Sequence, residues 1–148
     1  MRKRAPIRKS ASYLLKKAKA KLEKLQREVV LKRDGDCVLR HLDPLEKGCS
    51  YVMQADHFVT KHEGNDLTRY DLRNLNQLCS GHNCVKQYRA MCTIKLARVI
   101  DERYGEGTHE ELEKIAKKKD GVKLYMSDIE AKIKECEDYL ANKAVPKN

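Results

Sequence analysis

The segment QADHFVTKHEGNDLTRYDLRNLNQLCSGHNCVK, residues 54–86, crowds polar and metal-ligating side chains into a short stretch of chain. Across the whole sequence only 5% of residues are aromatic and 36% are charged. These fractions predict a small and mostly aliphatic hydrophobic core, which would need an additional cross-link for stability. The Cys and His residues in and around this segment are the candidates for that cross-link, so we expect the segment to decide the fold.

The rest of the chain predicts helices around a short extended region, and its 148 residues suit one domain. Residues 50–58, SYVMQADHF, are the best strand candidate. We expect an α+β fold whose first helix starts at Ser10 or Ser12 and stops at Gly35. Later helices are predicted over 85–105, 109–119 and 127–142, the last opened by the capping pattern SDIE. The chain divides into a basic helical arm, a core and a C-terminal helical extension, at 1–34, 35–104 and 105–148.

The net charge of +10 is distributed unevenly along the chain. Residues 1–33 hold 13 Lys and Arg against two Glu, a net charge of +11. A basic helix of this kind releases counterions when it lies on a phosphate backbone. We therefore expect nucleic acid along this helix, with contacts from Lys16, Lys17 and Lys24. The alternative is a solvated helix face without a partner.

The six cysteines are either disulfide partners or metal ligands. The basic start of the sequence, MRKRAPIRKSASYLLKKAKAK, is not followed by the apolar segment of a secretory signal, and no stretch is long enough for a membrane span. We expect a cytoplasmic protein, in the host cytoplasm if a phage encodes it, and no membrane partner. In a reducing compartment, clustered Cys and His more often bind zinc than form disulfides.

A structural zinc site is expected to bracket the segment 54–86. Zinc takes four Cys or His ligands in a tetrahedron, and Cys79 and His82 form a C-x2-H pair ahead of a predicted helix. Two alternatives stay open, because His41 competes with Cys49 and Cys84 competes with His82. Cys92 and Cys136 are interpreted as small buried hydrophobic residues. The favoured zinc ligands are Cys37, Cys49, Cys79 and His82.

These residues resemble the HNH, or ββα-metal, nucleases. The family pattern has an Asp-His pair at a strand end, an Asn in the connecting hairpin and a His or Asn opening the next helix. Here the matching residues are Asp56-His57, Asn74 and Asn83, with Lys86 completing the C-x2-[CH]-[HN]-x2-K tail. The spacing is most similar to that of the phage recombination nucleases of the NinG or Rap type, over roughly residues 25–100. The sequence departs from the pattern in the 11 residues between the first two cysteines, and in a His where Cys is usual.

The resemblance implies a catalytic site for phosphodiester hydrolysis. His57 would serve as the general base, since an imidazole with a pKa of about 6.5 is largely neutral near pH 7. One divalent ion, Mg²⁺ or Mn²⁺, would be held by the oxygen atoms of Asp56 and Asn83. Asn74 is expected to tie the hairpin and so aim the base. Neighbours on a regular strand face opposite ways, so the strand must end or bulge at the Asp-His pair.

The expected function is therefore a metal-dependent DNA endonuclease of the HNH type, acting on branched or recombination intermediates. Arg69 and Lys86 are further expected contacts to DNA phosphates, with a solvated surface role as the alternative for Arg69. An HNH nuclease that cuts linear duplex shares every catalytic residue and stays open as an alternative, as does a homodimer. A zinc-stapled nucleic-acid-binding module without catalysis is the rival from another class, but it leaves the Asp-His pair and both asparagines unexplained.

Overall fold

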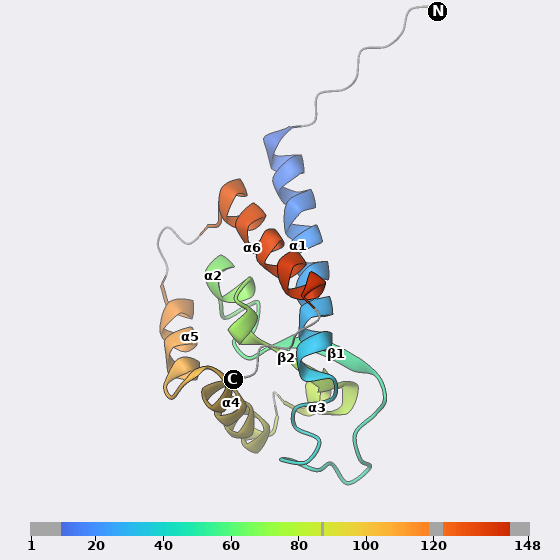
Figure 1. The fold of residues 1–148 in the computed structure, drawn as a ribbon. Helices are drawn as coiled ribbons and strands as arrows, with labels where there is room; N and C mark the ends of the chain where they lie inside the picture. The colour runs from blue at the N-terminus through green and yellow to red at the C-terminus, as the bar shows by residue number, and fades with distance from the viewer. Residues whose placement is uncertain (1–9, 87, 119–122, 143–148) are drawn as a thin grey trace, which may run out of the picture.

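The computed structural model describes residues 10–86, 88–118 and 123–142. Six helices, a short 3₁₀ helix and a two-stranded antiparallel sheet confirm the expected α+β class within these residues (Figure 1). The predictions for residues 1–9 of the basic segment, for the end of the 109–119 helix and for the C-terminal tail lie outside the described residues. In chain order the elements are α1 (Ala11–Asp34), β1 (Met53–His57), α2 (Asp66–Arg69), η1 (Leu72–Asn74), β2 (Leu75–Cys79), α3 (Ser80–Val85), α4 (Ala90–Tyr104), α5 (Thr108–Ala116) and α6 (Met126–Ala141).

Helix α1 begins and ends where its capping residues predict. The hydroxyl of Ser10 accepts the backbone N–H of Tyr13 at 3.3 Å, and Gly35 closes the helix with a φ of 67° that favours glycine. The helix lies beside α6 (Figure 1) and also contacts both strands. Its described part is thus built into the fold through one buried face, formed by Leu22, Gln26, Val29 and Val30.

Strands β1 and β2 pair in a register that matches Asp56 with Asn76 and His57 with Leu75. Between the strands, residues 58–74 form a loop that contains α2 and η1. Helix α3 follows β2 directly, so the order along this part of the chain is strand, loop, strand, helix. This arrangement brings the Asp-His pair of β1 next to Lys86 at the end of α3.

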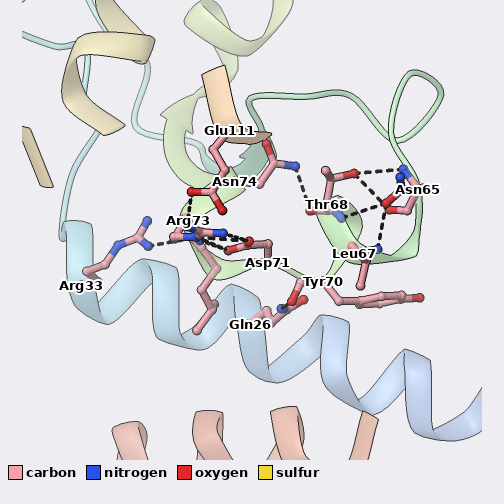
Figure 2. Close-up of polar contacts among 11 residues, drawn as sticks. Gln26, Arg33, Asn65, Leu67, Thr68, Tyr70, Asp71, Arg73, Asn74 and Glu111 are labelled. Atoms are coloured by element: carbon pink, nitrogen blue, oxygen red, sulfur yellow. Dashed lines mark hydrogen bonds and ion pairs between the residues drawn. The ribbon is translucent and has the colours of Figure 1, made fainter. Parts of the chain in front are cut away.

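Two side chains of α1 hold the loop between the strands. The amide of Gln26 donates to the carbonyl of Tyr70 at 2.9 Å. Arg33 donates to the carbonyls of Leu72 at 3.0 Å and Leu75 at 2.6 Å. Figure 2 shows both side chains reaching from α1 to this segment. Because backbone carbonyls buried near a helix need donors, these contacts fix the loop against α1.

The buried apolar side chains form two clusters. One cluster lies around β2, α4 and α5, and the other joins α1 to α6. Both are built mainly from aliphatic residues, as the composition predicts, and Cys92 and Cys136 are buried within them. The first cluster contains Cys37, Leu39, Phe58, Val59, Leu78, Cys79, Cys92, Leu96, Ile100 and Leu112, and the second contains Leu22, Val29, Tyr70, Leu124, Ile129, Ile133 and Cys136.

Two helix boundaries differ from the sequence-based expectation. The predicted helix over 85–105 is divided, because α3 ends at Val85 and α4 begins only at Ala90. Helix α6 begins ahead of Ser127, and its first turn is closed by the Asp128 carboxylate, which accepts the Tyr125 N–H at 2.8 Å. The prediction that Ser127 of SDIE opens the capping box was therefore wrong, because Tyr125 and Asp128 form it. Among the described residues, no helix has both the length and the apolar composition of a membrane span.

Candidate metal centre and catalytic cleft

Four side chains converge on one point beneath β2 and α3. The Sγ atoms of Cys37, Cys49 and Cys79 lie 3.3, 3.4 and 3.3 Å from Nδ1 of His82. All four ligand atoms lie within 4.8 Å of one another. Zinc bonds of about 2.3 Å to sulfur and 2.0 Å to nitrogen in a tetrahedron place S and N about 3.5 Å apart. The geometry therefore fits a metal ion such as zinc.

The ring orientation of His82 suits a metal ligand. Its Nε2 lies 2.6 Å from the backbone carbonyl of Asp43, which accepts a hydrogen bond. Nε2 therefore carries the proton, and Nδ1 presents its lone pair to the three sulfur atoms. A hydrogen bond on the far side of a ligating imidazole fixes its tautomer and orientation. His82 is fully buried, so this orientation is held by packing as well.

Asp43 connects the metal centre to α4. Its carboxylate is 3% exposed and accepts from Cys92 Sγ at 2.9 Å and from Arg89 at 3.1 Å, with Lys95 at 3.4 Å. These contacts hold the Asp43 backbone, whose carbonyl accepts from the metal-facing His. A buried carboxylate requires such partners. Side chains of α4 and of Arg89, which precedes it, therefore position one candidate metal ligand, His82, without belonging to the cluster.

The thiols of the cluster differ in how readily they ionise. Burial, together with the neighbouring Cys79 and Cys37 thiols, raises the pKa of Cys49 to about 12. For Cys79, burial also raises the pKa, but interactions with His82, including the hydrogen bond that its backbone N–H donates to the sulfur, outweigh burial and bring the pKa to about 6. Three thiolates at this spacing repel one another, so a cation is needed to ionise all of them.

The structure leaves both alternative zinc ligands outside the cluster. His41 and Cys84 are exposed, and neither belongs to the group of four converging ligands. Cys84 lies on α3, only two residues beyond His82, but the helical turn points the two side chains in different directions.

His57 is the end of β1 and lines a cleft of about 280 Å³ between α1 and the strand. Its Nε2 lies 3.0 Å from the backbone carbonyl of Arg69, so Nε2 donates and Nδ1 keeps a free lone pair. Burial, reinforced by the nearby cations Lys61 and Lys86, lowers the pKa of His57 in spite of the hydrogen bond to Arg69 and the charge of Asp56. The imidazole is therefore neutral at pH 7, as a proton acceptor must be.

Asp56 lines the same cleft as its neighbour, and the strand ends at this pair as expected. The carboxylate forms an ion pair with the ammonium of Lys86, which also donates to the carbonyl of His57 at 2.6 Å. Lys86 is only 10% exposed. The charge of the Asp56 carboxylate is therefore already balanced by a cation within the fold.

Asn83 lies on α3 and faces β1. Its amide nitrogen donates to the side-chain oxygen of Gln54 at 2.5 Å, which leaves the amide oxygen of Asn83 available to a cation. Gln54 and Asp56 are two residues apart on one strand face, and Asn83 and Lys86 are three apart on one helix face. The two faces meet, so the oxygen ligands expected for Mg²⁺ are on opposed surfaces.

Asn74 ties the loop between the strands. Its oxygen accepts the N–H of Val59 at 2.7 Å, and its nitrogen donates to the carbonyls of Val59 at 3.0 Å and Thr68 at 2.9 Å. The side chain is fully buried (Figure 2 shows it beside Thr68). The loop it fastens carries the Arg69 carbonyl that orients His57. These contacts match the positioning role expected for Asn74.

Asn74→Ala is expected to lower the free energy of unfolding by about 3 kcal/mol, because it leaves buried backbone groups at Val59 and Thr68 without partners. Thr93→Ala, at an exposed position on α4, is the control and should change it by less than about 0.5 kcal/mol. Urea unfolding of both variants measures the difference. Equal stabilities would show that the amide does not hold the loop.

The basic residues expected to contact DNA have different surroundings. Lys16, Lys17 and Lys24 are exposed on α1. Arg69 of α2, by contrast, is paired with Glu23 of α1, and Lys86 is paired with Asp56. The first three are therefore open to a phosphate backbone, whereas the last two bind carboxylates within the fold.

The structure adds two residues that the sequence did not single out for a role. Asp43 supports a metal ligand, and Glu23 lines the cleft of His57. One signal for Glu23 was present, because it is one of only two acidic residues in a segment with a net charge of +11. Asp43 carries no comparable signal in the sequence.

Comparison of the chain with protein-family models, curated proteins and solved structures gives no match.

Proposed function

We propose that the protein is a metal-dependent DNA endonuclease of the HNH type. The observation that carries the proposal is a neutral His57 with its Nδ1 free, in one cleft with a carboxylate and fastened by a buried Asn. A general base of this kind needs both the lone pair and a fixed orientation. The exposed lysines of α1 support an anionic polymer as the substrate.

In the proposed reaction, Nδ1 of His57 accepts a proton from the water that attacks phosphorus. The Arg69 carbonyl keeps the ring oriented through Nε2, and Asn74 holds the loop that carries this carbonyl. The proton stays on Nδ1 until it is released to solvent, because Nε2 is already a donor. Arg69 therefore acts on Nε2 of the imidazole, and Asn74 acts on the loop that carries the Arg69 carbonyl.

Asp56 and Asn83 would hold the catalytic Mg²⁺ or Mn²⁺. A carboxylate and an amide oxygen are ligands that such hard ions accept, and two protein ligands leave places for water and phosphate. The ammonium of Lys86 is already paired with Asp56, so the metal ion would have to displace it or share the carboxylate with it. When bound, the ion supplies Lewis-acid stabilisation of the departing 3′ oxygen.

The zinc centre would have a structural role in this enzyme. Its ligands come from the loop after α1, from the end of β2 and from α3. Zinc at this point would join these segments and keep α3, with Asn83 and Lys86, against β1. All four protein ligands are used, so no coordination place is left for a substrate water.

The test of the proposed function is cleavage of matched DNA substrates in the presence of Mg²⁺. Four-way junction, flap, linear duplex and single-stranded DNA of related sequence would be incubated with the purified protein, and the products mapped. We expect the branched substrates to be cut fastest. Equal cutting of linear duplex would favour the homing, restriction or packaging type of HNH nuclease. Tight binding without cleavage of any substrate would favour the non-catalytic zinc module.

Replacing Lys16, Lys17 and Lys24 together with Gln is expected to weaken DNA binding and reduce the slope of log affinity against log salt by about 2 to 3, because each phosphate contact on duplex contributes about 0.9. The same number of replacements at Lys114, Lys117 and Lys118 provides a charge-matched control away from α1. Fluorescence titrations at several salt concentrations measure both slopes. Identical slopes in the two variants would exclude α1 as the DNA-binding element.

A further inference from the structure

Glu23 brings a carboxylate from α1 to the cleft that holds His57. Its Oε1 accepts from Nε and Nη2 of Arg69, at 2.9 and 2.6 Å. The ammonium of Lys61 lies 3.8 Å from the same oxygen. The Glu23 carboxylate therefore forms ion pairs with both Arg69 and Lys61 at the edge of the cleft.

Arg69 is connected to the base through its own backbone. Its carbonyl accepts from Nε2 of His57, whereas its guanidinium is directed to Glu23. Its partner Glu23 lines the cleft of His57 together with Lys61, so a phosphate bound in place of the Glu23 carboxylate would lie at the edge of that cleft. Guanidinium groups bind phosphate through two parallel hydrogen bonds, each to a different oxygen. In the pair with Glu23 both bonds share one carboxylate oxygen, so a phosphate would suit the guanidinium better.

The ion pair is easily exchanged for another anion. The side chains of Arg69 and Glu23 are 39% and 25% exposed, and ion pairs this accessible to water contribute little to stability. Glu23 is nevertheless ionised at neutral pH, because the bonds and charge of Arg69 outweigh its burial and lower its pKa. The cations are thus already occupied by an anion before any substrate arrives.

We propose that Arg69 and Lys61 form a phosphate subsite beside His57, and that Glu23 of α1 occupies this subsite until a DNA phosphate displaces it. This inference rests on the proposed function for the identity of the ligand. Once displaced, Glu23 stays on α1 next to the bound phosphate and repels it. The carboxylate therefore acts as a brake on DNA binding, located in the helix whose other exposed charges attract DNA.

Two charge-matched variants test the brake. Glu23→Gln removes the carboxylate from the cleft, whereas Glu28→Gln removes one from an exposed position on the same helix. Both are made in a His57→Ala protein, so that binding is measured without cleavage. Labelled duplex and flap DNA would be titrated without added Mg²⁺ over a range of salt concentrations, and thermal melts would check the fold.

Glu23→Gln is expected to tighten binding at least about five-fold more than Glu28→Gln and to steepen the salt slope by about 1, since the subsite then presents one more net positive charge to the bound phosphate. Adding Arg69→Ala, which keeps the backbone carbonyl that orients the base, should remove this gain. Equal effects of the two Gln variants, or weaker binding after Glu23→Gln, would overturn the inference. The experiment measures DNA affinity and not cleavage. If Glu23→Gln does not tighten binding but the parent protein still cleaves DNA, only the role of Glu23 is rejected and the nuclease proposal stands.

Discussion

His57→Ala is expected to lower the rate of DNA cleavage by about 10²- to 10⁴-fold, the range that a general base typically contributes. DNA affinity and fold should change little, because the imidazole acts on the attacking water and the α1 lysines bind the backbone. Single-turnover cleavage of the best substrate, together with a binding titration, separates the two effects. Retention of the parental rate in a folded, zinc-loaded His57→Ala protein would remove the nuclease proposal.

His41→Ala is the matched control for this variant. It makes the same truncation at an exposed His outside the cleft and outside the metal cluster. Its cleavage rate should stay within about two-fold of the parent. Comparable losses in both variants would indicate that histidine truncation harms the protein in general.

The pH dependence of cleavage follows from the lowered pKa of His57. The base is active when neutral, so the rate falls as pH decreases through its pKa. Burial moves that pKa below the ordinary 6.5, which extends activity to lower pH. The log of kcat/KM should therefore fall with a slope of 1 only below about pH 6.5. An acid limb with its midpoint above pH 7 would contradict a buried, neutral His57.

Features set by neighbouring residues could be predicted from the sequence. Ser10 and Gly35 bound α1 because capping depends on a few adjacent backbone groups. The C-x2-H spacing of Cys79 and His82 also predicts their convergence, since one helical turn brings them together. The Asp-His pair at the end of β1 follows the same logic, because its position depends only on where the strand stops.

Contacts between distant segments could not be predicted in this way. Glu23 meets a residue 46 positions away, and Asp43 meets Cys92 across 49 positions. No local pattern specifies which distant side chains face each other, because that depends on how helices pack after they form. The sequence favoured Cys49 over His41 for the metal cluster without excluding His41, and the structure places Cys49 in the cluster. The spacing of both residues from Cys37 along the chain is compatible with metal binding. Only the path of the loop brings the sulfur of Cys49 to His82.

Removal of zinc is expected to unfold the region around β2 and α3. Purified protein should contain about one zinc ion per chain, because the three Sγ atoms and Nδ1 of His82 converge on one point. Structural zinc contributes about 10 to 16 kcal/mol of binding free energy in small zinc domains, which is folding free energy when the site does not exist in the unfolded chain. A strong chelator should therefore abolish the cooperative thermal transition, followed by circular dichroism.

Cys79→Ser and Cys84→Ser make this prediction specific to the cluster. Both replace one sulfur by oxygen, but the first removes a buried ligand and the second an exposed thiol on α3. Cys79→Ser should lose most bound zinc and melt at a lower temperature, whereas Cys84→Ser should keep both properties of the parent. Since the Cys49 thiol, with a pKa near 12, must lose its proton to bind the metal, zinc affinity should also fall as pH decreases. A well-folded, zinc-free Cys79→Ser protein with the parental melting temperature would show that the four residues pack together without serving as a metal staple. The support of α3 against β1 would then have to come from the hydrophobic cluster around Leu78 and from the contacts of Asn83 with Gln54 and of Lys86 with Asp56.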